Sequence, residues 1–479
     1  MADSDVERLR DAIDDAWEEA RNFGLDPFPT HFELVPASIM YEFASYSLPG
    51  RFSHWTHGKA YYRQKMQYDF GLSKIYEMVV NTNPSYAFLM DMNNLLQNTF
   101  VAAHVFGHTD FFKNNAYFQH TSRRMIDKAS IHAERIAKYE FDHGKGEVER
   151  FLDAVLSIQE HVDYNLLISE NEPQREERKP ANQLSSEYDD LWGMEKKAKK
   201  AEEERDLRPG RPAKFPEKPQ KDILGFLVQY APHLQPWQRD IVDIVRTEML
   251  YFVPQMQTKT MNEGWASIWH SRIMRKLGDR GVISDSETVE FAQLHSGVLS
   301  PSRTSLNPYY LGFKMLEDIE RRWDNPTQEE QERFGRKPGM GKQKIFEVRE
   351  LENDVSFLRN YLTEDLVKEL DLYLYKKEGD EWVIVEKNWE KVRDGIVASM
   401  TNFGYPYLVV DNGDYRGNRE LYIKHLFEGQ ELDLVYAEKT LQHVHLLWGR
   451  PVHLETVYEG KKILLSYDGE RNSKSTIEK

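Results

Sequence analysis

Two histidines four residues apart are the clearest sign of chemistry in this sequence. The segment VAAHVFGHTDFF carries His104 and His108. On an α-helix, residues four apart lie on the same face, with Cβ atoms about 5–6 Å from each other. Two imidazoles at that separation can bind one divalent metal ion. Because the chain contains no cysteine, any further metal ligand must be another histidine or a carboxylate side chain.

This spacing is similar to the H-E-x-x-H motif of zinc peptidases, in which the glutamate after the first histidine is the general base. Here Val105 occupies that position, and a valine side chain cannot take a proton from water. The sequence therefore predicts a metal site without the base of an ordinary zinc peptidase.

A second cluster lies in the segment TMNEGWASIWHSRIM, where Glu263 and His270 are seven residues apart. This spacing leaves them on nearly the same helix face, two turns apart. If this helix packs antiparallel to the first, His104, His108 and Glu263 form a three-ligand site with one open position, which is typical of a catalytic zinc ion. His270 would be a fourth ligand or an acid/base group. The alternative is that these side chains are hydrogen-bonded inside an aromatic-rich helical bundle and bind no metal.

Two more histidines are candidates for a role in catalysis. His295, in LHSGVLSPSR, precedes a turn-rich segment and is expected to approach the same cavity. His54, in RFSHWTHGK, belongs to a loop-like stretch that either lines a substrate cleft or forms a tight turn between helices. We therefore predict His270, His295 and His54 as catalytic candidates, and His104, His108 and Glu263 as metal ligands.

The elements that would position these residues are mainly helices. Apolar residues at helical spacing predict one large helical domain from residues 1–168 and 223–370. Residues 169–222 are polar, charged and proline-rich, which predicts an insertion or linker. From residue 371 to 479 the apolar period approaches two, and two strands, a helix, two strands, a helix and two strands predict a small C-terminal α+β sandwich domain. The fold class is thus mainly α.

Composition excludes several kinds of partner. The formal net charge of -16 repels a phosphate backbone, so nucleic acid is not expected to bind. No run of about 20 apolar residues predicts membrane insertion. The acidic, amphipathic N-terminal segment lacks the features of a secretory signal, and we expect a cytoplasmic protein. Phosphate-binding glycine loops and a G-x-S-x-G elbow are both absent.

Long motifs from about residue 24 to 456 resemble the signature blocks of the stage V sporulation protein R (SpoVR) family. They occur in the order GLDPFPTHFELVP, MYEFASYSLPGRFSHWTHGK, KIYEMVVNTNPSYAFLM, AHVFGHTDFFKNN, MNEGWASIWHSRIM, HSGVLSPSRTSLNPYYLGFKMLEDIERRWD and HLLWGRPVHLET. The polar motif positions that carry over are His54, His104, His108, Asn114, Glu263, His270, His295 and Asn307.

The resemblance implies a biological setting and no reaction. It implies a role in spore cortex formation and sporulation, or in stress and starvation responses, alongside a serine protein kinase and a von Willebrand-type domain protein. The residue clusters and the resemblance together leave two hypotheses about function. The first is a metal-dependent hydrolase or amide-transforming enzyme that acts on a cell-wall precursor or a partner protein. The second is a non-enzymatic effector or scaffold that binds the kinase.

Overall fold

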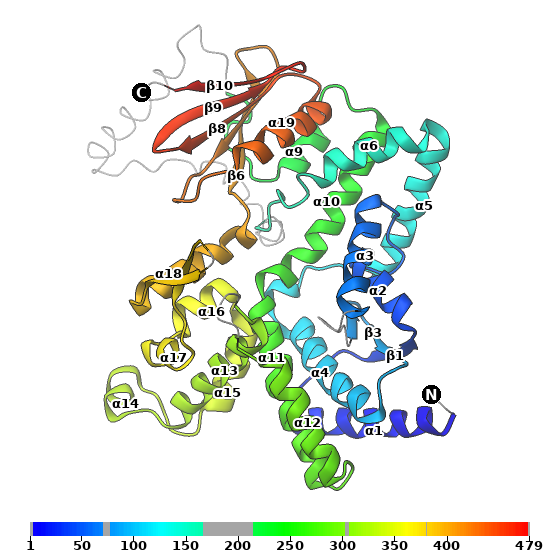
Figure 1. Ribbon diagram of the computed structural model, residues 1–479, viewed down its shortest axis with the longest axis vertical. Coiled ribbons are helices and arrows are strands. Elements are labelled where there is room, and N and C mark those ends of the chain that lie inside the picture. The colour runs from blue at the N-terminus through cyan, green and yellow to red at the C-terminus, as the bar shows by residue number, and fades with distance from the viewer. Residues whose placement is uncertain (1–2, 70–76, 166–213, 302–305, 380, 478–479) are drawn as a thin grey trace, which may run out of the picture. The chain divides into compact units, whose positions relative to one another are not determined.

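A computed structural model describes residues 3–69, 77–165, 214–301, 306–379 and 381–477 (Figure 1). Contacts along the chain group into two units. The first, which we call the helical unit, comprises Met1–Glu149 and Thr247–Tyr405; the second, the sheet unit, comprises Arg150–Arg246 and Pro406–Lys479. Most of the predicted insertion, residues 169–222, lies outside the described residues, which resume at Lys214.

The helical unit is rich in helices, as the sequence predicted. Its helices are α1 (Asp3–Asn22), α2 (Ala37–Tyr46), α3 (Trp55–Asp69), α4 (Leu95–Asn114), α5 (Met125–His143), α11 (Lys259–Asp279), α12 (Asp285–Val298), α13 (Pro308–Asp324), α14 (Gln328–Phe334), α15 (Gly341–Leu351), α16 (Asp354–Tyr361), α17 (Glu364–Glu369) and α18 (Trp389–Met400), with the short 3-10 helices η1 (Ala116–Phe118) and η2 (Thr401–Gly404). The boundaries between the units fall inside α6 (Lys145–Leu156) and α10 (Pro236–Gln257).

A small sheet interrupts the region that the sequence predicted as continuous helical bundle. Strand β3 (Ser85–Met90) lies between β1 (Thr30–Val35), to which it is parallel, and β2 (Glu77–Val80), to which it is antiparallel. The sequence did not predict these strands because β3 is buried at nearly every position. A short, mostly apolar run of this kind has the same hydrophobic pattern as a buried helix.

Helices α4 and α11 pack against each other at the centre of the helical unit (Figure 1). The side chain of Asn94 begins α4 by accepting a hydrogen bond from Gln97 N, and Gln97 Oε1 accepts one from Asn94 N in return, a capping box. A Cβ added to Gly107 of α4 would lie only 2.5 Å from Ala266 Cα of α11. The absence of a side chain at Gly107 therefore allows the two backbones to approach closely.

The sheet unit contains a five-stranded sheet in the order β10-β9-β8-β7-β6. Its strands are β6 (Leu408–Tyr415), β7 (Glu420–His425), β8 (Val452–Tyr458), β9 (Lys461–Tyr467) and β10 (Asn472–Thr476). Helix α19 (Leu434–Trp448) packs on β8 and β9 and ends at Gly449 in the left-handed conformation. The predicted strands over β6 to β9, the final hairpin and this helix with its glycine cap are confirmed; β10 was not predicted.

Two further segments belong to these units. The predicted strand pair β4 (Leu374–Glu378) and β5 (Glu381–Glu386) forms a separate two-stranded sheet that groups with the helical unit, although the sequence placed these residues in the C-terminal domain. In the sheet unit, Gln220 pairs with Val410 of β6, and α9 (Ile223–Tyr230) follows it. In the part of the chain that is described, no helix has both the length and the apolar character needed to cross a membrane.

Candidate metal centre

Helix α4 presents His104 and His108 one turn apart, both buried. Two residues after His108, on another face of the helix, the carboxylate of Asp110 fixes the rotation of α4. It accepts hydrogen bonds from Trp265 Nε1 of α11 at 2.8 Å and from Arg349 Nη1 of α15 at 3.1 Å. Because Asp110 is fully buried, these charge-assisted bonds hold α4 in one orientation against its neighbours.

Helix α11 runs antiparallel to α4, which is the arrangement that the three-ligand hypothesis required. His104 contacts His270, whereas His108, later in α4, contacts Asn262, which is earlier in α11. This pairing places Glu263 opposite both imidazoles. Its Oε2 lies 3.6 Å from His104 Nε2 and 3.5 Å from His108 Nε2. The predicted convergence of these three side chains is therefore confirmed.

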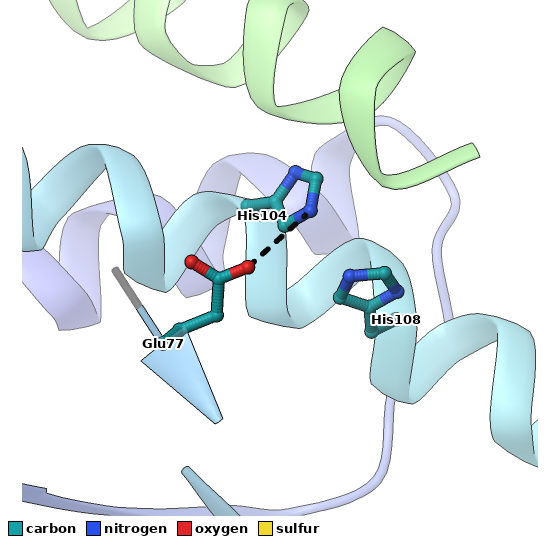
Figure 2. A group of neighbouring side chains, drawn as sticks. All are labelled: Glu77, His104 and His108. Atoms are coloured by element: carbon teal, nitrogen blue, oxygen red, sulfur yellow. Dashed lines mark ion pairs between the residues drawn. The ribbon is translucent and has the colours of Figure 1, made fainter. Parts of the chain in front are cut away.

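A second carboxylate, Glu77, reaches the same point from strand β2. Figure 2 shows His104 and His108 projecting from α4 on the side where Glu77 lies, and Glu77 Oε1 is 3.9 Å from His104 Nε2. One ligand atom from each of these three residues lies within 4.8 Å of the others. The sequence prediction missed Glu77. Predicting that the Glu77 side chain faces α4 would have required assigning EMVV to a strand.

The inner ring nitrogens of the two histidines have hydrogen-bond partners from α11. His108 Nδ1 lies 2.9 Å from Asn262 Oδ1, and His104 Nδ1 lies 2.8 Å from His270 Nδ1. His270 Nε2 is in turn 2.8 Å from His295 Nδ1 on α12. The structure thus places His270 and His295, both predicted as catalytic candidates, in a chain behind His104. Burial lowers the pKa of His270 well below its ordinary value and that of His295 to about 4.

Two of the outer atoms of the site lack hydrogen bonds among the described residues. His104 Nε2 and Glu263 Oε2 are both buried, and neither has a hydrogen-bond partner among the described residues. Their separation of 3.6 Å is too long for a hydrogen bond. Because a buried polar atom without a partner carries a desolvation penalty, this pair of atoms is the least satisfied feature of the site.

Electrostatics favour a neutral His108 imidazole beside an ionised Glu263 carboxylate. Burial, followed by the charge of His104, lowers the pKa of His108 to about 4. Burial alone would raise the pKa of Glu263, but the neighbouring imidazoles outweigh it and the net shift is downward. The pKa of Glu77 is raised, chiefly by burial. Burial also raises the pKa of Tyr309 well above its ordinary value, and the charges of Glu263 and Glu77 add to that shift.

Tyr309 completes the surroundings of His104. Its ring stacks on the His104 ring with centroids 6.0 Å apart. The side chain of Asn307 holds Tyr309 in place by capping α13, where its Oδ1 accepts hydrogen bonds from Tyr309 N and Tyr310 N. The side chains of Glu77 and Glu263 are 19% and 18% exposed, so neither carboxylate side chain is completely enclosed by the described residues.

Two other positions from the sequence analysis have different surroundings. His54 lies at the start of α3, where its Nδ1 is 2.8 Å from Thr56 Oγ1 and its ring contacts those of Trp55 and His57. It is therefore not among the residues that the structure gathers around His104. Asn114 donates a hydrogen bond to the backbone carbonyl of Asp110, which stabilises the end of α4.

Val105 is fully buried in the hydrophobic core of the helical unit. The residue after the first histidine therefore points away from the ligand face, so that the general base of the H-E-x-x-H motif has no equivalent on α4. The carboxylates that face the two imidazoles come from β2 and α11 instead.

Comparisons with known proteins identify the family. A family model described as "SpoVR like protein" matches residues 3–405, and one described as "SpoVR-like C-terminal domain" matches residues 406–459. An uncharacterized protein of Escherichia coli strain K12, YcgB, is 30% identical over 471 residues, which is 93% of this chain and 91% of YcgB. No solved structure matches the chain. The chain belongs to the SpoVR family.

Proposed function

We propose that this protein binds a divalent metal ion through His104, His108 and Glu263, and that it is a metal-dependent hydrolase or amide-transforming enzyme. The observation that carries the proposal is the unsatisfied pair of buried atoms, His104 Nε2 and Glu263 Oε2. A bound cation would satisfy both atoms, because each offers it a lone pair.

The spacing of the ligand atoms supports this proposal quantitatively. Nitrogen and oxygen ligands lie about 2.0–2.2 Å from zinc, so two ligands of a tetrahedral site are about 3.3–3.6 Å from each other. Glu263 Oε2 is 3.6 Å and 3.5 Å from the two imidazole Nε2 atoms. These distances exceed those of hydrogen bonds and match those of ligands that share one ion.

Glu77 has two roles open to it. As a fourth ligand it would close the site, which is typical of structural zinc. As a partner of a bound water it would accept a proton, the role that Val105 cannot fill in α4. Its longer distance to His104 Nε2, 3.9 Å, favours the second role, and the hydrolase proposal depends on it.

The donor set limits the identity of the metal. Two imidazoles and one or two carboxylates suit zinc, and they also suit iron or manganese. Zinc is our choice because the carboxylate and both histidines come from packed helices that leave one further position open, as in catalytic zinc sites. When bound, the ion would polarise a carbonyl oxygen or lower the pKa of a water molecule. Tyr309, stacked on His104, would border the substrate on that side.

Elemental analysis tests the metal directly. Protein purified without a metal-affinity tag is compared with the His104→Ala/His108→Ala variant for zinc, iron and manganese. We expect close to one metal ion per chain in the first and almost none in the second. Circular dichroism of both proteins controls for folding. Equal, sub-stoichiometric metal in both would remove the proposal.

That negative result would leave the alternative of a non-enzymatic effector or scaffold, in which the buried histidines and glutamates only hold the helices together. The expected partner would then be a serine protein kinase, and the expected setting sporulation or a stress response. Capture of the kinase by the His104→Ala/His108→Ala variant, as efficiently as by the unaltered protein, would support that alternative.

A further inference from the structure

The hydrogen bonds behind the two metal-facing imidazoles have a defined direction. Asn262 Oδ1 is an acceptor, so His108 Nδ1, at 2.9 Å, must be the donor. A neutral imidazole carries one N–H and one lone pair. With the proton on Nδ1, the lone pair of His108 is on Nε2, which is the atom 3.5 Å from Glu263 Oε2.

The same reasoning applies to His104 and the chain behind it. If His270 donated to His104 Nδ1, the proton of His104 would be on Nε2, where the described residues offer it no hydrogen-bond partner. In the opposite direction, His104 Nδ1 donates to His270 Nδ1 and His270 Nε2 donates to His295 Nδ1. Every ring nitrogen of His104 and His270 then has a role at the proposed metal site, because the lone pair that remains on His104 Nε2 faces Glu263.

We propose that Asn262 and His270 are positioning residues that hold His108 and His104 in the Nδ1–H tautomer, so that both Nε2 lone pairs converge in front of Glu263. This inference rests on the proposed metal site. Its chemical basis is general, because a hydrogen bond from the non-ligating ring nitrogen orients the imidazole and raises its basicity toward a metal. Helix α11 thus supplies one ligand, Glu263, and the acceptors for both imidazoles.

Substitutions at Asn262 separate the hydrogen bond from simple packing. Asn262→Leu has nearly the same shape and no acceptor, whereas Asn262→Asp keeps an acceptor oxygen. Ser267→Ala is the matched control, because Ser267 is buried in the same helix and its Oγ has no hydrogen-bond partner among the described residues. His270→Phe keeps a ring between Phe100 and Phe291 and removes the acceptor for His104.

Zinc affinity is measured by competition between each metal-free protein and a chromophoric chelator, with Zn²⁺ alone as the probe and circular dichroism as the check on folding. We expect Asn262→Leu and His270→Phe each to weaken zinc binding about 10- to 100-fold. Asn262→Asp should bind at least as tightly as the unaltered protein, and Ser267→Ala should not change affinity.

The outcomes distinguish this inference from the metal proposal. If Asn262→Leu binds zinc as tightly as the unaltered protein, or if Leu and Asp weaken it equally, Asn262 is not a positioning residue. If the unaltered protein binds no zinc, the metal proposal fails instead. In a separate measurement, ¹⁵N spectra of the histidine-labelled, metal-free protein report the two tautomers directly. A proton on Nε2 of His104 or His108 would overturn the inference.

Discussion

Replacing Gly107 with alanine tests how the site is assembled. The added Cβ would lie 2.5 Å from Ala266 Cα and 3.1 Å from Ala266 Cβ, whereas carbon atoms in contact are about 3.5–4.0 Å apart. Helices α4 and α11 would have to separate by roughly 1 Å at this crossing. Overpacking of this kind costs about 1–3 kcal/mol, which outweighs the gain of up to about 1 kcal/mol from replacing a helical glycine with alanine.

The same movement would disturb the metal ligands. His104 and His108 flank Gly107 on α4, and Glu263 faces them from α11. Metal sites tolerate errors of only about 0.2 Å in ligand distance, so a separation of roughly 1 Å should weaken zinc binding more than tenfold. We therefore expect Gly107→Ala to lower both the free energy of unfolding and the zinc affinity.

Denaturant unfolding and zinc competition are measured on Gly107→Ala and on a control, Gly58→Ala. Gly58 lies inside α3, and a Cβ there would meet nothing within 4 Å. The control should be slightly more stable than the unaltered protein, by about 0.5–1 kcal/mol. If Gly107→Ala gained stability to the same extent and bound zinc normally, the close contact between α4 and α11 would be refuted.

Two further predictions concern buried charges. Asp110→Ala leaves Arg349 buried without its carboxylate partner and should lower the free energy of unfolding by about 3–5 kcal/mol; a denaturant midpoint equal to that of the unaltered protein would contradict the anchoring role of Asp110. In the sheet unit, burial lowers the pKa of Lys221 from 10.5 to about 8. Between these pH values the native state binds fewer protons than the unfolded state, so stability should rise with pH across this window. Lys221→Met should flatten that rise, measured from denaturant midpoints at pH 8 and 10, whereas substitution of the exposed Lys218 by methionine should not.

The helical part of the site was predictable because helix geometry is regular. Four-residue spacing alone places His104 and His108 on one face, and seven-residue spacing does the same for Glu263 and His270. That these two faces meet required one additional assumption, antiparallel packing. The contacts of His104 with His270 and of His108 with Asn262 together confirm it. Whether the group binds a metal stays a prediction.

The remaining features depend on tertiary contacts that a local pattern does not encode. Glu77 enters the site from a strand whose pairing partner, β3, is mostly apolar and buried and therefore ambiguous in sequence. Gly107 is informative only once Ala266 is known to lie opposite it. His54 was selected for its aromatic and polar neighbours, and the structure shows its contacts with Thr56 and Trp55. A catalytic role for His54 stays a prediction.

The discontinuous make-up of the sheet unit has a consequence for how the chain acquires its structure during synthesis. Lys214 pairs with Asp411, 197 residues later, and the ring of Phe226 in α9 stacks on Trp448. Residues 214–230 therefore leave the ribosome long before the sheet that covers them exists. A fragment made of residues 406–479 alone would in turn expose the β6 edge that Gln220 pairs with, and unpaired strand edges promote aggregation.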